Sequence, residues 1–240
     1  MEVHWKFKNK EHAERVASSG FEYILIDEAD KQQVRENMMN AIMAQIGNRK
    51  IMKQYIRSLK MICVHDYPDK LPNLFAQIMA HLNNTSSRES VYAGLQGLFA
   101  LAARFEFELD EDRVPLHQII KESFSVLGAL VSQMMQHKDD SDALHMLHLI
   151  CKVFYVSNQL QMCPYLMEAG NLDPWVQFFK AILDMETPPA LQGTTDDVDE
   201  INRREKNIFW KLKGITGKLT YRIFVKYGNP TIVEEKPHIQ

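Results

Sequence analysis

The chain has 240 residues, of which 45% are hydrophobic and 25% charged, and its net charge is −3. This length allows a sizeable core, and the absence of a run of about 18 apolar residues excludes a membrane-spanning helix. The charge is uneven along the chain. Residues 61–200 carry eight Lys and Arg against 20 Asp and Glu, whereas residues 201–240 carry nine against three. The acidic middle favours basic partners and argues against nucleic acid as its main ligand.

The cysteines and the first residues indicate the cellular compartment. Cys63, Cys151 and Cys163 are odd in number and lie in apolar helical contexts. We therefore expect buried, reduced thiols in a cytosolic or nuclear protein. Residues 1–16 contain no apolar segment of the signal-peptide type, so we expect no signal peptide.

The first half of the chain predicts a series of helices separated by breaks. Residues 1–19 predict a helix, and Asp27 is expected to cap the next one, with its partner following at 49–65. Pro68 ends that partner, because the residue before a proline avoids the helical conformation. A short helix with Pro72 near its start precedes a helix at 89–105. Gly94 and Gly97 within that helix predict close packing on a neighbour.

The second half continues the pattern. Helices are expected at 112–137, 143–156 and 173–183, and residues 186–200 read as an acidic inter-helix linker. A helix of about seven turns is predicted at 202–228, and the tail, 231–240, is expected to be disordered. The helices come in pairs at 27–65, 71–105, 112–156 and 172–228.

These pairs favour one fold class. A single pair cannot bury its apolar face, whereas stacked pairs share a continuous core. We predict an all-α HEAT-repeat α-solenoid, a right-handed superhelical stack of antiparallel helix pairs. It would form one continuous array of four to five repeats over residues 1–230. A closed helical bundle is the alternative.

The predicted last helix combines opposite charges at its start. It carries eight Lys and Arg, and an acidic run directly precedes it: Asp196, Asp197, Asp199 and Glu200. The two sets could neutralise each other within the fold, or they could form a partner-binding surface. Trp210 beside Lys211 and Lys213 is a pattern that can bind nucleic acid, although a packing anchor is the favoured interpretation.

We find no pattern for catalysis. Phosphate-binding, nucleophile-elbow and zinc-protease motifs are absent from the sequence. His145, His148 and Cys151 share spacing on one helix but lack a fourth ligand, so ordinary helix residues are expected rather than a zinc site. The carboxylate pairs fall at helix starts and linkers, where they act as solvated caps. We expect no enzyme activity, no cofactor and no metal.

Five segments resemble motifs of the importin-β superfamily of transport receptors (karyopherins), in the same order. They read DEADKQQVREN (27–37), HDYPDKLPNLFAQI (65–78), EFELDEDRVPLHQII (106–120), LDPWVQFFKAILDMETPP (172–189) and FWKLKGITGKLTYRIFVKYGNP (209–230). The last segment points to the importin seven/importin eight subgroup. Leu71 and Phe209 stand where the family favours tryptophan, and Gly214 and Gly217 interrupt the last helix. The chain therefore resembles a divergent member.

The resemblance implies a function and several partners. Such receptors bind basic cargo, including ribosomal proteins and histones, carry it through nuclear pores and release it on binding Ran–GTP. They move between cytoplasm and nucleus, and no membrane or direct nucleic-acid partner is expected. They have roughly twenty repeats, so the resemblance predicts that this chain is a fragment that lacks most of the Ran-binding repeats. A HEAT-repeat interaction scaffold without a transport role is the alternative.

The resemblance also suggests where partners would bind. The second helix of each pair would line the concave face, and the acidic run at 196–200 would be a cargo-binding loop. First helices would lie on the convex face, where FG-repeat nucleoporins insert phenylalanine side chains. Candidate nucleoporin contacts are Phe75, Met79, Phe178 and Phe179, with core packing as the competing interpretation for each.

Overall fold

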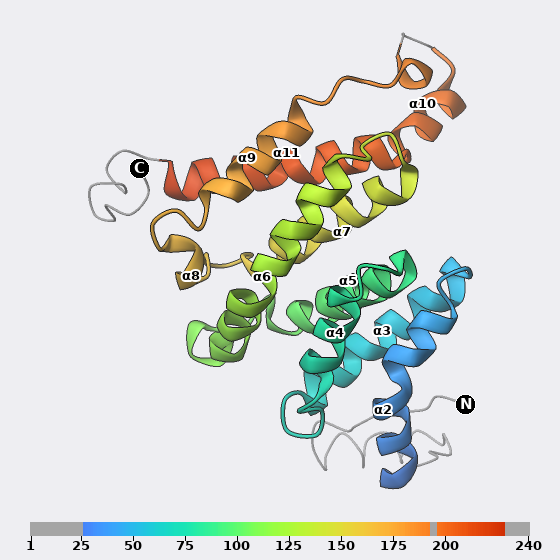
Figure 1. The fold of residues 1–240 in the computed structure, drawn as a ribbon, viewed down its shortest axis with the longest axis vertical. Coiled ribbons are helices and arrows are strands. Elements are labelled where there is room, and N and C mark those ends of the chain that lie inside the picture. The colour runs from blue at the N-terminus through green and yellow to red at the C-terminus, as the bar shows by residue number, and fades with distance from the viewer. Residues whose placement is uncertain (1–25, 193–195, 229–240) are drawn as a thin grey trace, which may run out of the picture. The chain divides into compact units, whose positions relative to one another are not determined.

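A computed structural model describes residues 26–192 and 196–228 (Figure 1). All regular secondary structure in these residues is helical, which confirms the all-α prediction. No helix among them is both long and apolar enough to cross a bilayer. The helix expected at 1–19, the tail at 231–240 and the centre of the linker lie outside the described residues. The chain folds into two compact units, Met1–Leu101 and Ala102–Gln240.

The first unit contains four helices whose ends follow from local capping. Asp27 accepts a hydrogen bond from the Ala29 amide at 2.8 Å, and Asn48 accepts one from the Ile51 amide at 3.3 Å. Each side chain satisfies one of the amides that a helix start leaves without a partner. The helices are α2 (Glu28–Ala44), α3 (Arg49–Asp66), α4 (Leu74–Asn83) and α5 (Arg88–Ala102).

Two glycines allow α5 to approach its neighbours closely. A Cβ atom on Gly94 would lie 3.0 Å from the backbone nitrogen and the side chain of Leu82. A Cβ atom on Gly97 would lie 2.9 Å from side-chain atoms of Met39 and Ile78. The predicted close packing is confirmed, and both contacts lie in the core of the first unit.

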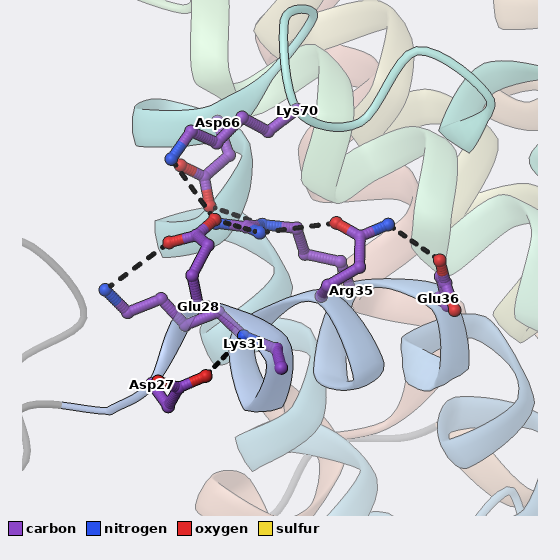
Figure 2. A network of polar contacts seen from close by, with 9 residues as sticks. Asp27, Glu28, Lys31, Arg35, Glu36, Asp66 and Lys70 are labelled. Atoms are coloured by element: carbon purple, nitrogen blue, oxygen red, sulfur yellow. Dashed lines mark hydrogen bonds and ion pairs between the residues drawn. The ribbon is translucent and has the colours of Figure 1, made fainter.

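A buried ion pair joins α2 to the end of α3 (Figure 2). The Arg35 Nε atom donates to Asp66 Oδ2 at 2.9 Å, and both residues are only 3% exposed. Arg35 also donates to Glu28 at 2.8 Å, and Lys70 donates to the same Glu28 oxygen at 3.2 Å. Burial lowers the pKa of Arg35, but its bonds to Glu28 and Asp66 outweigh this and raise it. The pair fixes α2 against α3 through charges that lie 31 residues apart.

The second unit is built on α6, α7, α9 and α11. The helix α11 packs on α7 and on α9, and α6 packs on α7 (Figure 1). The elements are η1 (Ala103–Phe105), η2 (Asp110–Arg113), α6 (Val114–Met135), α7 (Ser141–Ser157), α8 (Pro164–Met167), α9 (Asp173–Leu183), η3 (Pro189–Leu191), α10 (Val198–Glu205) and α11 (Ile208–Tyr227).

An aromatic cluster forms the core between α6, α7 and α9. The Trp175 ring lies 4.9 Å from Phe124 and 5.2 Å from Phe154, measured between ring centroids. Phe179 meets Phe154 edge to face at 5.0 Å, and Phe178 lies 5.5 Å from Phe179. Such contacts add to the stabilisation from burial. The aromatic face of α9, which carries Trp175, therefore holds this helix in place.

The predicted single helix at 202–228 is wrong in one respect. The chain forms two helices, α10 and α11, which are separated at Lys206 and Asn207. The Asn207 side chain accepts a hydrogen bond from the Phe209 amide at 2.9 Å and caps α11. Asparagine caps a helix start well and competes with a continuous helix through this same bond. The basic residues are consequently divided between two helices.

A buried arginine holds the end of α7. Arg113 is 1% exposed, and it donates to the Ser157 carbonyl at 2.5 Å and to the Gln161 carbonyl at 3.4 Å. Burial lowers its pKa, and the nearby Asp110 carboxylate opposes that shift. The Met162 amide donates to the Tyr227 hydroxyl at 2.9 Å. The loop after α7 is thereby tied to both η2 and the end of α11.

Candidate protein-interaction surfaces

The acidic run at 196–200 is the start of a helix rather than a loop. The Asp197 side chain caps α10 by accepting hydrogen bonds from the Asp199 amide at 2.9 Å and the Glu200 amide at 3.4 Å. Negative charge is favoured there because the amides of a helix start carry partial positive charge. The expectation of a linker running to Glu200 is therefore corrected: α10 begins at Val198. The role of the acidic run in cargo binding stays a prediction.

Charge neutralisation takes place inside α10. Glu200 pairs with Arg203 at 2.6 Å and with Arg204 at 2.8 Å. The hydrogen bond from Arg204, followed by that from Arg203, holds the pKa of Glu200 below its ordinary value. Asp196 and Asp199 remain exposed at the start of the helix. Only part of the acidic run is neutralised by its own unit.

The cations of α11 make no ion pair with a carboxylate among the described residues. Lys213 donates to the carbonyls of Leu183 and Met185 at 3.0 and 2.5 Å. It therefore lies at the C-terminal end of α9, where helix carbonyls attract positive charge.

The end of α11 interacts with the end of α7 in the same way. Arg222 donates to the Tyr155 carbonyl at 3.4 Å, and its guanidinium lies 3.8 Å from the centroid of the Tyr155 ring. Lys226 donates to the carbonyls of Gln159 and Leu160 at 3.3 and 2.8 Å. Lys211 and Lys218 are exposed. Neutralisation of these cations by the acidic run was one of two alternatives, and the described residues show no such ion pairs.

An apolar groove lies between α9 and α11, and the sequence analysis did not foresee it. It encloses about 340 Å³. Phe224, which is 70% exposed, forms part of its wall, and Tyr221 is 71% exposed. The signal in the sequence was an excess of apolar residues on α11 beyond one buried stripe. The groove is lined by Val176, Phe179, Lys180, Leu183, Asp184, Thr220, Ile223, Phe224, Tyr227 and Gly228.

Trp210 does not act as the packing anchor that was favoured. It is 36% exposed and meets Phe209 edge to face, with ring centroids 5.2 Å apart. Phe209 is the buried member of the pair. Neighbours in sequence point about 100° apart on a helix, so Trp210 does not share the buried direction of Phe209.

The four nucleoporin candidates divide into two kinds. Phe178 and Phe179 are 5% and 2% exposed and belong to the aromatic core, which favours the packing interpretation for both. Phe75 and Met79 on α4 are half-buried. Of the four, these two keep surface that a partner side chain could reach.

The histidine and cysteine residues of α7 do not form a ligand set. No three His, Cys, Asp or Glu side chains gather in the described ranges as a metal would need. Burial, followed by the charges of Lys152, His145 and Lys211, lowers the pKa of His148 to about 4. Burial raises the pKa of the Cys151 thiol to about 12, and its sulfur lies 3.7 Å from the Thr216 hydroxyl. All three cysteines are buried, and no disulfide joins any two of them.

The fold and these surfaces define a class of protein. Helices that pack on their neighbours in sequence, apolar cores and broad exposed helix faces are the properties of helical-repeat proteins that bind other proteins. No cluster of metal-ligating side chains occurs among the residues that the structure describes.

Comparison with known proteins identifies relatives within that class. The chain is 30% identical to importin-8 of Homo sapiens over 207 residues, which are 85% of the chain and 19% of that protein. It is 27% identical to the importin beta-like SAD2 homolog of Arabidopsis thaliana over 228 residues, 95% of the chain and 21% of that protein. Exportin-2 of Oreochromis niloticus is 26% identical over 73% of the chain and 18% of its own length. The chain is a divergent relative of the importin-β family of transport receptors.

The chain spans about a fifth of the length of the importins it matches. No family model and no solved structure matches it. Its importin relatives support the HEAT-type helical repeat that the sequence predicted, and they are transport receptors, not enzymes.

Proposed function

We propose that the chain works as part of a nuclear import receptor that binds basic cargo and carries it through nuclear pores under the control of Ran–GTP. The observation that carries the proposal is similarity to two importins over 85% and 95% of the chain. Ribosomal proteins and histones are the proposed cargo, and the receptor would move between cytoplasm and nucleus. Ran–GTP would act mainly through repeats other than those in this chain.

The charge distribution supports a basic cargo. Asp196 and Asp199 are exposed at the start of α10, and residues 110–112, with the sequence Asp-Glu-Asp, are exposed in η2. Carboxylates without a full set of internal partners attract Lys and Arg side chains of a second protein. The proposed cargo surface is therefore made of helix starts and their flanking turns.

A histone-binding experiment tests this proposal. The full chain is titrated with fluorescently labelled core histones, and affinity is expected to fall steeply between about 0.1 and about 0.5 M salt, because salt screens exposed charges. The double variant Asp196→Lys/Asp199→Lys is expected to bind several-fold more weakly. Glu122→Lys/Asp139→Lys is the matched control, since both residues are exposed in the same unit and it makes the same charge change. Salt-insensitive binding, or an equal loss in both variants, would contradict the proposed surface.

Nucleoporin binding is tested on α4. Phe75→Asp and Met79→Asp are expected to weaken binding to a phenylalanine-glycine repeat peptide, because both side chains keep accessible apolar surface. His81→Asp is not a suitable control, since the His81 ring is hydrogen-bonded to Ser90. Ala76→Asp, at an exposed position of the same helix, is the better one.

A HEAT-repeat scaffold without a transport role remains the second candidate. The exposed α9–α11 groove favours it, because a scaffold needs only a binding face. Binding of neither nucleoporin repeats nor Ran–GTP, together with retained binding to another protein, would support the scaffold over the receptor.

A further inference from the structure

The face of α11 beside the α9–α11 groove has no partner in the described part of the chain. Phe224 and Tyr221 are 70% and 71% exposed, and Val225 is also exposed. On the α9 side, Val176 and Leu183 are exposed at the groove wall. Aromatic and aliphatic side chains at an open groove form the kind of surface that an apolar side chain of a second protein fills.

The exposed face follows a helix-packing repeat. Its residues recur at alternating spacings of four and three along α11 and its cap: Trp210, Gly214, Gly217, Tyr221, Phe224 and Gly228. A stripe with this period packs along a second helix, because it keeps one seam facing the partner. The residues of this stripe, together with the groove, are called the α11 docking face below.

Two of the three glycines of this face, Gly214 and Gly217, have no packing role in the described structure. A Cβ atom on Gly214 or Gly217 would meet nothing within 4 Å. Glycine weakens a helix interior relative to alanine, so the chain loses stability at both positions without a compensating contact of its own. The missing side chains leave a shallow shelf between Trp210 and Tyr221, where the backbone of another helix can approach closely.

The charge of α11 indicates which charge a partner helix would carry. Ile208–Tyr227 contains five Lys and Arg and no Asp or Glu. None of the five makes an ion pair with a described carboxylate. Lys211 and Lys218 are exposed and follow the stripe residues Trp210 and Gly217 directly in sequence. An acidic partner would complement this charge, whereas a basic one would be repelled.

We propose that the α11 docking face binds an acidic amphipathic helix of a partner protein. Its apolar side chains would occupy the groove and the glycine shelf, and its carboxylates would lie against Lys211 and Lys218. This goes beyond the proposed transport function, because the partner has the opposite charge from the basic cargo and binds a different surface.

Designed peptides test the proposal with the full chain. The first is an acidic helix as long as α11, with leucine at alternating spacings of four and three residues and glutamate on both flanks of this stripe. The second keeps the stripe but carries lysine in place of glutamate, and the third is an uncharged phenylalanine-glycine repeat. Binding is measured by fluorescence anisotropy. The acidic helix is expected to bind at least about tenfold more tightly than either of the others.

Variants then locate the binding site. The Cβ atom of Gly217→Leu would meet nothing within 4 Å in the free chain, and the leucine would occupy the shelf. The fold and thermal stability are therefore expected to persist while binding to the acidic peptide falls by about tenfold or more. Lys218→Glu is expected to weaken binding several-fold. Its matched control, Lys138→Glu, reverses an exposed charge elsewhere in the second unit and is expected to change nothing.

Several results would overturn the proposal. Equal binding of the three peptides would remove the charge argument, and unchanged binding by Gly217→Leu would remove the shelf. A dimer of the chain that Phe224→Glu converts to a monomer would make a second copy the occupant. Tenfold tighter peptide binding after truncation at Gly228 would make residues 229–240, which include the sequence IVEE, the occupant instead.

Discussion

Glycine-to-alanine substitutions are predicted to have opposite effects at two helix positions. Gly94→Ala gains about 1 kcal/mol of helix propensity. Its Cβ atom would lie 3.0 Å from the backbone nitrogen and the side chain of Leu82, which is fully buried. Backbone cannot withdraw as a side chain can, and overpacking costs about 1 to 3 kcal/mol. The expected net effect is a loss of about 0.5 to 2 kcal/mol in the free energy of unfolding.

Gly217→Ala introduces the same methyl group where nothing lies within 4 Å. Only the propensity term remains, so the free energy of unfolding is expected to rise by about 0.5 to 1 kcal/mol. Urea unfolding followed by far-UV circular dichroism measures both variants against the parent chain. Gly214→Ala is the internal control, because its surroundings are equally open. If Gly94→Ala stabilised the chain as much as Gly217→Ala, the close packing of α5 on Leu82 would be refuted.

Three further predictions concern buried polar groups. Arg113→Ala is expected to lower the free energy of unfolding by about 3 kcal/mol, because the buried carbonyl of Ser157 loses its hydrogen-bond donor. Lys121→Ala, at an exposed site, is the control and should be nearly neutral in the same urea titration. Burial lowers the pKa of His148 in the folded chain to about 4, below the ordinary 6.5. As the pH falls from 6.5 toward 4, the unfolded chain binds a proton that the folded chain does not, so the free energy of unfolding falls. His148→Gln should therefore reduce the loss of stability between about pH 7 and about pH 4.5 by up to roughly 2.4 kcal/mol, and an unchanged pH dependence would contradict this. Cys151 should resist a thiol reagent in the folded chain and react only after unfolding, because burial keeps its thiol protonated; rapid labelling of the native chain would contradict that.

Local features of the fold were predictable because their causes are local. The cap at Asp27 and the end of α3 before Pro68 depend on residues within one turn. The close approach at Gly94 follows from the absence of a side chain within an apolar helix. In each case the physical cause and its consequence lie within a few residues of sequence.

Other features depend on residues that are distant in sequence. Arg35 and Asp66 lie 31 residues apart, and no spacing rule links a buried cation to that carboxylate. An apolar stripe also does not show whether its residues meet a core or solvent: Phe178 is buried and packs against Trp175, whereas Phe224 is equally apolar and open. The groove between α9 and α11 could not be predicted, because it exists only where two helices fail to fill the space between them.

The break between α10 and α11 at Asn207 could also not be predicted from the spacing of residues. Apolar and basic spacing continues from 202 to 228 with neither proline nor glycine before Gly214, so the pattern favours one helix. A cap replaces helix hydrogen bonds with a side-chain bond of similar strength. The balance between the two is too small for spacing alone to decide.

The two proposed surfaces would bind partners of opposite charge. In the second unit acidic groups lie at helix starts, as at Asp197 and residues 110–112, whereas α11 contains five Lys and Arg and no Asp or Glu. Surface charges act over roughly 10 Å at physiological salt, so a substitution is felt mainly at its own surface.

This separation leads to a crossed prediction for the two proposed sites. Asp196→Lys/Asp199→Lys should weaken histone binding and leave the affinity for the acidic helix unchanged. Lys218→Glu should weaken the acidic helix and leave histone binding unchanged or slightly stronger, since it adds negative charge. Both affinities are measured for both variants in one buffer. If each variant weakened both ligands equally, the two would share one surface, and the assignment of cargo to helix starts and of the acidic helix to α11 would be wrong.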